Sequence, residues 1–78
     1  MLDEVAKLIN EHVRSVAEGL QEVSLLAEEC FGGDDGYVRS WIGRSNSVFG
    51  NAAPVDLIVQ GRGDEVMSYL KGIKQYGR

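Results

Sequence analysis

The chain has 78 residues, of which 44% are hydrophobic and 26% are charged, and its formal net charge is −4. This composition fits one small globular domain and excludes an intrinsically disordered chain, which combines low hydrophobicity with high net charge. The negative charge also argues against a domain that holds nucleic-acid phosphates, so we do not expect this chain to bind DNA directly.

Few residues are available for disulfide, metal or membrane chemistry. Cys30 is the only cysteine and His12 the only histidine, so neither an internal disulfide nor a zinc site is expected. No apolar run approaches the roughly 20 residues that span a bilayer. The N-terminus is acidic, unlike a secretion signal. We therefore expect a cytoplasmic protein without a cofactor or a metal.

The first third of the sequence has the pattern of an amphipathic helix. Between residues 2 and 26, apolar residues recur in steps of three or four, and charged residues occupy the opposite face. Gly19 interrupts this pattern at a cost of up to about 1 kcal/mol relative to alanine. The pattern predicts either one bent helix or two helices that meet near residues 18–21.

The apolar stripe of this helix has two interpretations. It can be the core face of the domain, or it can be a seam between two copies of the chain, because its steps also suit a short coiled coil. A core this small gains from dimerisation, so we expect a homodimer. The candidate dimerisation residues are Leu2, Val5, Ile9, Val13, Val16 and Leu20.

The helical pattern continues to Phe31 and stops at the sequence GGDDG, where glycines suit the left-handed conformation that ends a helix. Asp34 or Asp35 can cap the next helix. We expect that helix over residues 36–43. Its inward residues are predicted to be Val38, Trp41 and Ile42, with Arg39 outward.

Residues 43–51 are predicted to form a loop, because they are rich in glycine, serine and asparagine. Pro54 suits the first turn of a helix, although the short run VDLIV is equally compatible with a buried strand. Gly61 ends this element and Asp64 is predicted to cap a final helix. That helix turns Val66, Leu70 and Ile73 inward.

No set of residues predicts an active site, so we expect a protein that is not an enzyme. The paired acids Asp34–Asp35, Glu28–Glu29 and Asp64–Glu65 are adjacent in sequence, and adjacent side chains on a helix point in different directions. His12 lacks a nucleophilic partner. Cys30 is interpreted as a small core residue.

Residues 23–78 contain an ordered set of residues at defined spacings: Trp41, Asn46, Gly50, Pro54, Asp56, Leu57, Gly61, Tyr76 and Gly77. With this set, most of the chain resembles the toxin-binding domain of the Xre/MbcA/ParS-like antitoxins. The resemblance covers residues 23–78 and rests on the order and spacing of a set of residues. Phe49, Asn51 and Ala53 depart from the family pattern, and Ala53 lacks the capping hydroxyl usual there, worth about 1 kcal/mol.

This resemblance implies a partner, namely a RES-domain toxin that acts on NAD and that its cognate antitoxin holds inactive. Many family members also carry a helix-turn-helix domain upstream, for which residues 1–22 are too few. The apolar pattern therefore predicts an N-terminal amphipathic helix over 1–22, and the resemblance implies an antitoxin toxin-binding domain over 23–78. The chain as a whole is expected to be one compact all-α domain.

The resemblance further implies that the C-terminal end approaches the active-site cleft of the toxin. The last eight residues contain three bases and no acid, and a guanidinium or a tyrosine ring suits a nucleotide cleft. Alternatively, these bases simply face water near a helix C-terminus, where the helix dipole favours them. The candidate toxin-binding residues are Lys71, Lys74, Gln75, Tyr76, Gly77 and Arg78.

A second hypothesis belongs to a different class of function. The chain can be a homo-oligomeric helical adaptor or structural protein that has no toxin partner. In that case self-association through the N-terminal helix would persist without any toxin encoded nearby. For the antitoxin hypothesis, a toxin-sized gene would lie next to that of this chain.

Overall fold

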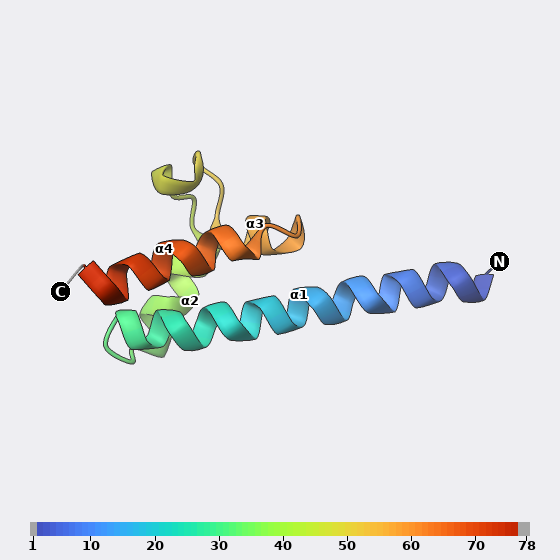
Figure 1. Cartoon of the computed structure of the whole chain (residues 1–78), viewed down its shortest axis with the longest axis horizontal. Helices are drawn as coiled ribbons and strands as arrows, with labels where there is room; N and C mark the ends of the chain where they lie inside the picture. The colour runs from blue at the N-terminus through green and yellow to red at the C-terminus, as the bar shows by residue number, and fades with distance from the viewer. Residues whose placement is uncertain (1, 77–78) are drawn as a thin grey trace.

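A computed structural model describes residues 2–76 of the chain. Within this range it contains four α-helices and one short 3₁₀-helix (Figure 1). No strand forms there, and the single isolated β-bridge joins Asn46 to Ala52. The predicted all-α fold is confirmed. The elements are α1 (Leu2–Cys30), α2 (Asp35–Gly43), η1 (Ser47–Phe49), α3 (Pro54–Val59) and α4 (Gly63–Tyr76).

The N-terminal helix is continuous, so of the two predicted arrangements the structure contains the single helix. α1 has 29 residues and passes through Gly19 without a break. At Gly19 the helix comes close to α3, because a Cβ atom placed there would lie 3.2 Å from Cγ2 of Ile58. The glycine therefore marks a close approach between two helices instead of a helix boundary.

The connection between α1 and α2 follows the predicted punctuation. Gly32 and Gly33 both have positive φ, and the N–H of Gly33 donates to the carbonyl of Glu28 at 2.7 Å. Asp34 caps α2, because its side chain accepts from the N–H of Tyr37 at 3.0 Å. The predicted inward residues of α2 are confirmed as buried. They are Val38, Trp41 and Ile42.

The predicted loop at residues 43–51 is an arm that projects from the side of α4 away from α1 (Figure 1). Asn46 organises it by accepting from the N–H of Val48 at 3.0 Å, and Gly50 and Asn51 have positive φ. Phe49 anchors the arm to the body. Its ring lies edge-on to Tyr69, with the two centroids 5.4 Å apart.

The sequence VDLIV forms a helix and not a strand. Pro54 occupies the first turn of α3, and the backbone N–H of Ala53 donates to Oδ2 of Asp56 at 3.1 Å. This bond is the half of a capping box that does not need a hydroxyl, so Asp56 satisfies one of the free N–H groups at a helix start that has alanine at the cap.

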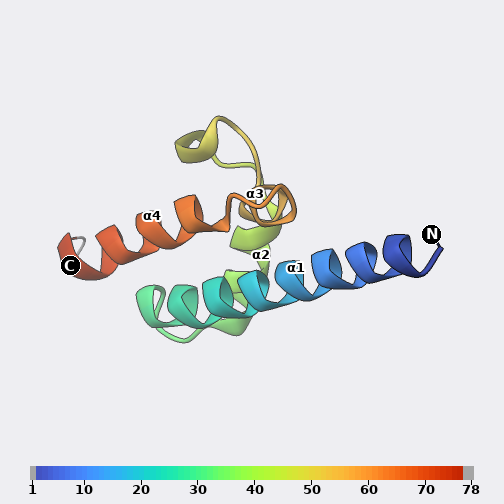
Figure 2. The same ribbon diagram turned by 45° about the vertical axis from the view of Figure 1, so that its right-hand side comes forward.

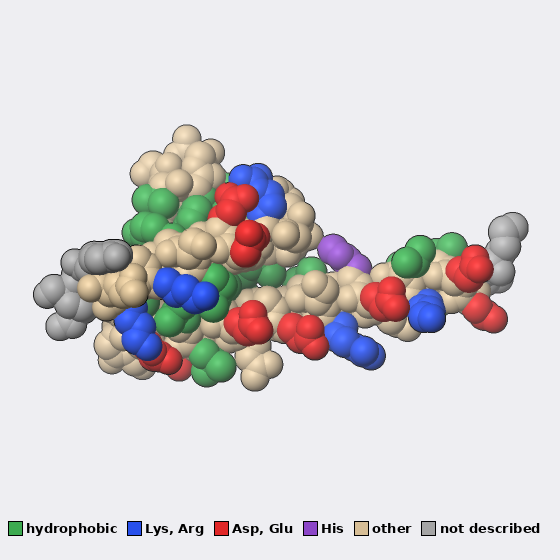
Figure 3. All heavy atoms as spheres, in the orientation of Figure 1, with side chains coloured by type: hydrophobic (Ala, Val, Ile, Leu, Met, Phe, Trp, Pro, Cys, Tyr) green, Lys and Arg blue, Asp and Glu red, His purple; other side chains and the backbone are tan. Residues whose placement is uncertain are grey.

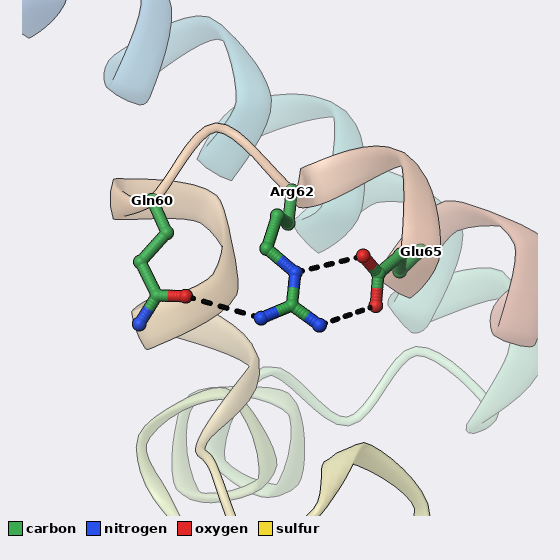
Figure 4. A network of polar contacts seen from close by, with 3 residues as sticks. All are labelled: Gln60, Arg62 and Glu65. Atoms are coloured by element: carbon green, nitrogen blue, oxygen red, sulfur yellow. Dashed lines mark hydrogen bonds and ion pairs between the residues drawn. The ribbon is translucent and has the colours of Figure 1, made fainter.

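The tight corner between α3 and α4 is closed by Gly61, which has positive φ, and by the side chain of Arg62. The guanidinium donates to both carboxylate oxygens of Glu65, at 2.8 and 3.0 Å, and to Gln60 at 3.3 Å (Figure 4). α4 begins at Gly63, so the prediction that Asp64 caps it is wrong, and Asp64 lies in the first turn. An acid there still suits the helix dipole.

The core lies where α4 runs beside the C-terminal half of α1, with α2 and α3 closing its sides. The views in Figures 1 and 2 agree that the N-terminal half of α1 extends beyond all the other helices. The molecule measures 51 × 24 × 21 Å, and this extension accounts for the long dimension. The largest fully buried side chains are Val23, Val38, Pro54, Leu57, Val66 and Leu70.

Candidate functional site

The C-terminal end of α4 contains the predicted toxin-binding residues that the structure describes. Lys71, Lys74 and Gln75 are exposed and line one shallow hollow. Tyr76 belongs to α4, but its side chain lies outside the described part, as do Gly77 and Arg78. The structure therefore brings three of the six predicted residues together on one surface.

Lys74 is held by an ion pair with Glu29, which lies one residue before the end of α1. The hydrogen bond to Glu29 raises the pKa of Lys74, so the ammonium is charged at any physiological pH. More than half of each side chain is exposed, so the pair is a surface contact with a small effect on stability. To bind an external anion, Lys74 would have to break its ion pair with Glu29.

Lys71 lies one helical turn earlier and has no ion-pair partner within residues 2–76. It borders both the terminal hollow and a second, open groove between α1 and α4. Lys71 and Lys74 thus form a short basic edge at the end of the domain. Such an edge can bind a carboxylate or a phosphate through charge-assisted hydrogen bonds.

Glu29 is a residue that the sequence did not point to as part of this edge. It is 45 residues away from Lys74 in the chain, and only the packing of α4 along α1 brings the two side chains together. No periodicity or motif signals such a pair. Its effect is to reduce the net positive charge of the candidate site by one unit.

The predicted dimerisation residues are divided by the fold. Val16 and Leu20 pack against the core of their own chain. Val5, Ile9 and Val13 lie on the extended half of α1 and are more than half exposed. Leu2 is the first residue of α1, and its side chain lies outside the described part. One stripe therefore serves as core at one end and is uncovered at the other.

Five aromatic side chains form a continuous cluster that the sequence analysis did not anticipate beyond Trp41. Neighbouring ring centroids are 5.1 to 6.3 Å apart, with Trp41 near the centre and stacked on Tyr69. The cluster joins the end of α1, α2, the projecting arm and α4, so it fixes the arm relative to the basic edge. Its members are Phe31, Tyr37, Trp41, Phe49 and Tyr69.

Cys30 packs against the core and its Sγ donates to the carbonyl of Leu70 at 3.3 Å. Burial raises the pKa of this thiol, and the neighbouring charge of Glu29 raises it further. The protonated thiol is a poor nucleophile and a poor metal ligand. In the described range, no three His, Cys, Asp or Glu side chains converge on a possible metal position, and no helix is both long and apolar enough to cross a membrane.

A comparison with protein families places these features in context. The family model named antitoxin Xre/MbcA/ParS C-terminal toxin-binding domain matches residues 26–75, from the end of α1 almost to the end of α4. The match includes the core helices, the projecting arm and the basic edge. The searches among curated proteins and solved structures returned no match. The chain therefore belongs to the Xre/MbcA/ParS antitoxin family and carries its C-terminal toxin-binding domain.

Proposed function

We propose that the chain is the antitoxin of a type II toxin–antitoxin system and inhibits a RES-domain toxin that acts on NAD. The observation that carries this proposal is the family match over residues 26–75, which gives the chain a toxin-binding domain. The RES-domain identity of the toxin follows from the resemblance described above. We further propose that the pair acts in the cytoplasm, a compartment that suits a single unpaired cysteine.

In this proposal the end of α4 covers the active-site cleft of the toxin. Lys71 and Lys74 supply positive charge at that end, and a cleft that binds NAD must accommodate the charged pyrophosphate of its substrate. Ammonium groups can bind the acidic or polar groups there while the end of the chain excludes the nucleotide. Gln75, Tyr76, Gly77 and Arg78 complete the proposed contact.

The test is co-expression of the full chain with a RES-domain toxin encoded by the neighbouring gene, followed by a pull-down and an assay of NAD loss. We expect a stable complex in which NAD loss is blocked. A variant truncated after residue 73 should bind less tightly and allow NAD loss to resume. Retained inhibition after truncation would overturn the covering role of the C-terminal end.

Charge reversal gives a finer version of this test with a matched control. The double variant Lys71→Glu/Lys74→Glu should lose inhibition if the basic edge contacts the toxin. Arg39→Glu/Arg44→Glu makes the same change in net charge at two exposed positions in and just after α2 and should leave inhibition unchanged. Equal loss in both variants would indicate a general effect of charge and would contradict a specific contact at α4.

Glu29→Gln probes the ion pair that engages Lys74. Because this change frees the ammonium for an external partner, the proposal predicts equal or tighter toxin binding. Weaker binding would show that Glu29 itself contributes to the contact and that Lys74 does not act alone.

The alternative function is a homo-oligomeric adaptor without a toxin partner. The uncovered apolar face of α1 is the observation that favours it. Failure of the chain to form any complex with the neighbouring toxin, combined with stable self-association, would support this alternative over the antitoxin.

A further inference from the structure

The most exposed apolar surface of the chain lies on the N-terminal half of α1, which we call the overhang and define as residues 2–15. Four large apolar residues there are between 54% and 66% exposed. Figure 3 shows hydrophobic side chains along this part of the helix, outside the compact body. Single exposed apolar residues are ordinary, but a row of them on one helix indicates an interaction site. The four are Val5, Leu8, Ile9 and Val13.

The overhang is uncovered because α4 begins too late to reach it. α4 runs in the same direction as α1: its first turn, at Gly63, borders the same groove as Gly19, and Lys74 pairs with Glu29 near the other end. α4 therefore covers α1 only from about Gly19 onward. Residues before Val16 have no helix of their own chain packed against the apolar stripe.

The stripe itself does not change at the point where the cover ends. From Ala6 onward, apolar residues alternate in steps of three and four, which is the seven-residue repeat of a helix that packs lengthwise against another helix. The covered half of this repeat has α4 as its partner helix. The repeat runs through Ala6, Ile9, Val13, Val16, Leu20 and Val23.

We propose that the overhang pairs in antiparallel orientation with the overhang of a second copy of this chain. The argument for this occupant is the charge along the two flanks of the stripe. At 100° per residue, Asp3, Lys7 and Arg14 lie along one flank. The other flank is apolar or neutral and carries Val5, Leu8 and His12.

An antiparallel pair matches these flanks and a parallel pair does not. In the antiparallel arrangement each flank faces the same flank of the other copy, so apolar meets apolar. When the two overhangs overlap fully, Asp3 of each copy lies level with Arg14 of the other. In a parallel arrangement the apolar flank would face the charged flank, and Asp3 would lie level with Asp3.

The proposed pairing produces a dimer and no larger assembly. The pairing is two-fold symmetric, so each overhang is used once and no further copy can add to it. The overhang is about 21 Å long at 1.5 Å per residue, and an interface this short is smaller than that of a permanent dimer. We expect a reversible dimer with a dissociation constant of roughly 1–100 μM.

The test is sedimentation equilibrium of the full chain, without any toxin, from about 1 μM to 1 mM. In the full overlap Ile9 lies beside the two-fold axis, so Ile9→Asp places two carboxylates close together and should weaken association at least tenfold. Leu25→Asp makes the same change at a position of α1 that is equally exposed (56% against 58%) but outside the overhang. It should leave association unchanged.

Charge variants test the orientation. At low salt, Arg14→Asp should weaken the dimer, and Asp3→Arg/Arg14→Asp should restore it, because the double change reverses both members of each pair. If the pairing is parallel, Arg14 faces the apolar flank of the other copy and has no acidic partner there, so Arg14→Asp has little effect. That result would overturn the antiparallel arrangement.

The remaining outcomes also decide the inference. A monomer throughout the concentration range, or equal association of the wild type and Ile9→Asp, would overturn it. If the chain is monomeric alone and Ile9→Asp abolishes capture of a co-expressed toxin, the toxin occupies this face instead. Circular dichroism of each variant checks that α1 is still folded. The inference does not depend on the proposed function, because the association measurements that test it use the isolated chain.

Discussion

Val13 and Val23 lie on the same apolar stripe of α1, and 60% of Val13 is exposed whereas Val23 is completely buried. Both are valines on one continuous helix, and both belong to the same repeat. They differ because α4 runs beside the second half of α1 and not beside the first. An identical sequence pattern thus produces a hydrophobic core at one place and an interaction surface at another.

The largest expected difference between the two halves of α1 is in the protection of their backbone amides from hydrogen exchange. Amides of residues 20–30 are expected to open only with global unfolding, whereas those of residues 5–12 should fray in the monomer, because a short helix without packing is marginal. The difference in protection should reach several orders of magnitude at low concentration. Uniform protection along a monomeric α1 would contradict the comparison.

Truncation of the two valines should give the next largest difference. Val23→Ala removes buried methyl groups and leaves a cavity, so it should lower the free energy of unfolding by about 2 kcal/mol. Val13→Ala should change it by less than about 0.5 kcal/mol in the monomer. Urea unfolding of both variants at low concentration measures this difference, and similar losses would mean that Val13 is also part of a core.

Two glycines inside helices sharpen the comparison: Gly19 lies where the covered part of α1 begins, and Gly72 lies near the C-terminal end of α4. Gly72→Ala should stabilise the chain by about 0.5–1 kcal/mol, because a Cβ there meets no atom within 4 Å. Gly19→Ala should gain less or destabilise, because its Cβ would lie 3.2 Å from the buried side chain of Ile58. Equal thermal stabilisation of the two variants would argue against a close approach of α1 and α3.

The smallest effect is expected at the C-terminal end of α1. Burial raises the pKa of Cys30, so the unfolded chain releases the thiol proton at a lower pH than the folded chain does. Stability is therefore complete below the ordinary thiol pKa and decreases as the pH rises through the raised value. Compared with Cys30→Ala, the wild type should lose stability as the pH rises above about 8.5, the ordinary thiol pKa. Parallel stability curves would show that the thiol is not buried.

Local chemistry allowed most of the elements to be predicted. The helix predicted over residues 36–43 starts one residue earlier, at Asp35, because Asp34 is the cap of the two that were predicted, and Val38 and Trp41 are buried as predicted. Pro54 favoured a helix without excluding a strand, and the bond between Ala53 and Asp56 shows how that helix starts. The start of α4 was misplaced by two residues because Gly63 already adopts a helical conformation, so Asp64 lies inside the first turn and not at the cap.

The candidate site was predictable only in part. The order and spacing of residues such as Trp41 and Gly61 identified the family, and the matched family model confirms it. The ion pair between Lys74 and Glu29 and the aromatic cluster around Trp41 could not be predicted, because their members come from segments far apart in the sequence. Contacts of this kind leave no periodic signal.

The sequence by itself determined that most of the chain is helical, approximately where several helices end, and which face of each helix is apolar. These properties depend on interactions between residues a few positions apart, such as caps and turns. Only the tertiary structure decided that the apolar stripe of α1 is covered from about Gly19 onward and uncovered before it. The physical reason is that burial of the stripe depends on where the covering helix starts and how long that helix is. The apolar pattern of α1 does not indicate the start or the length of another helix.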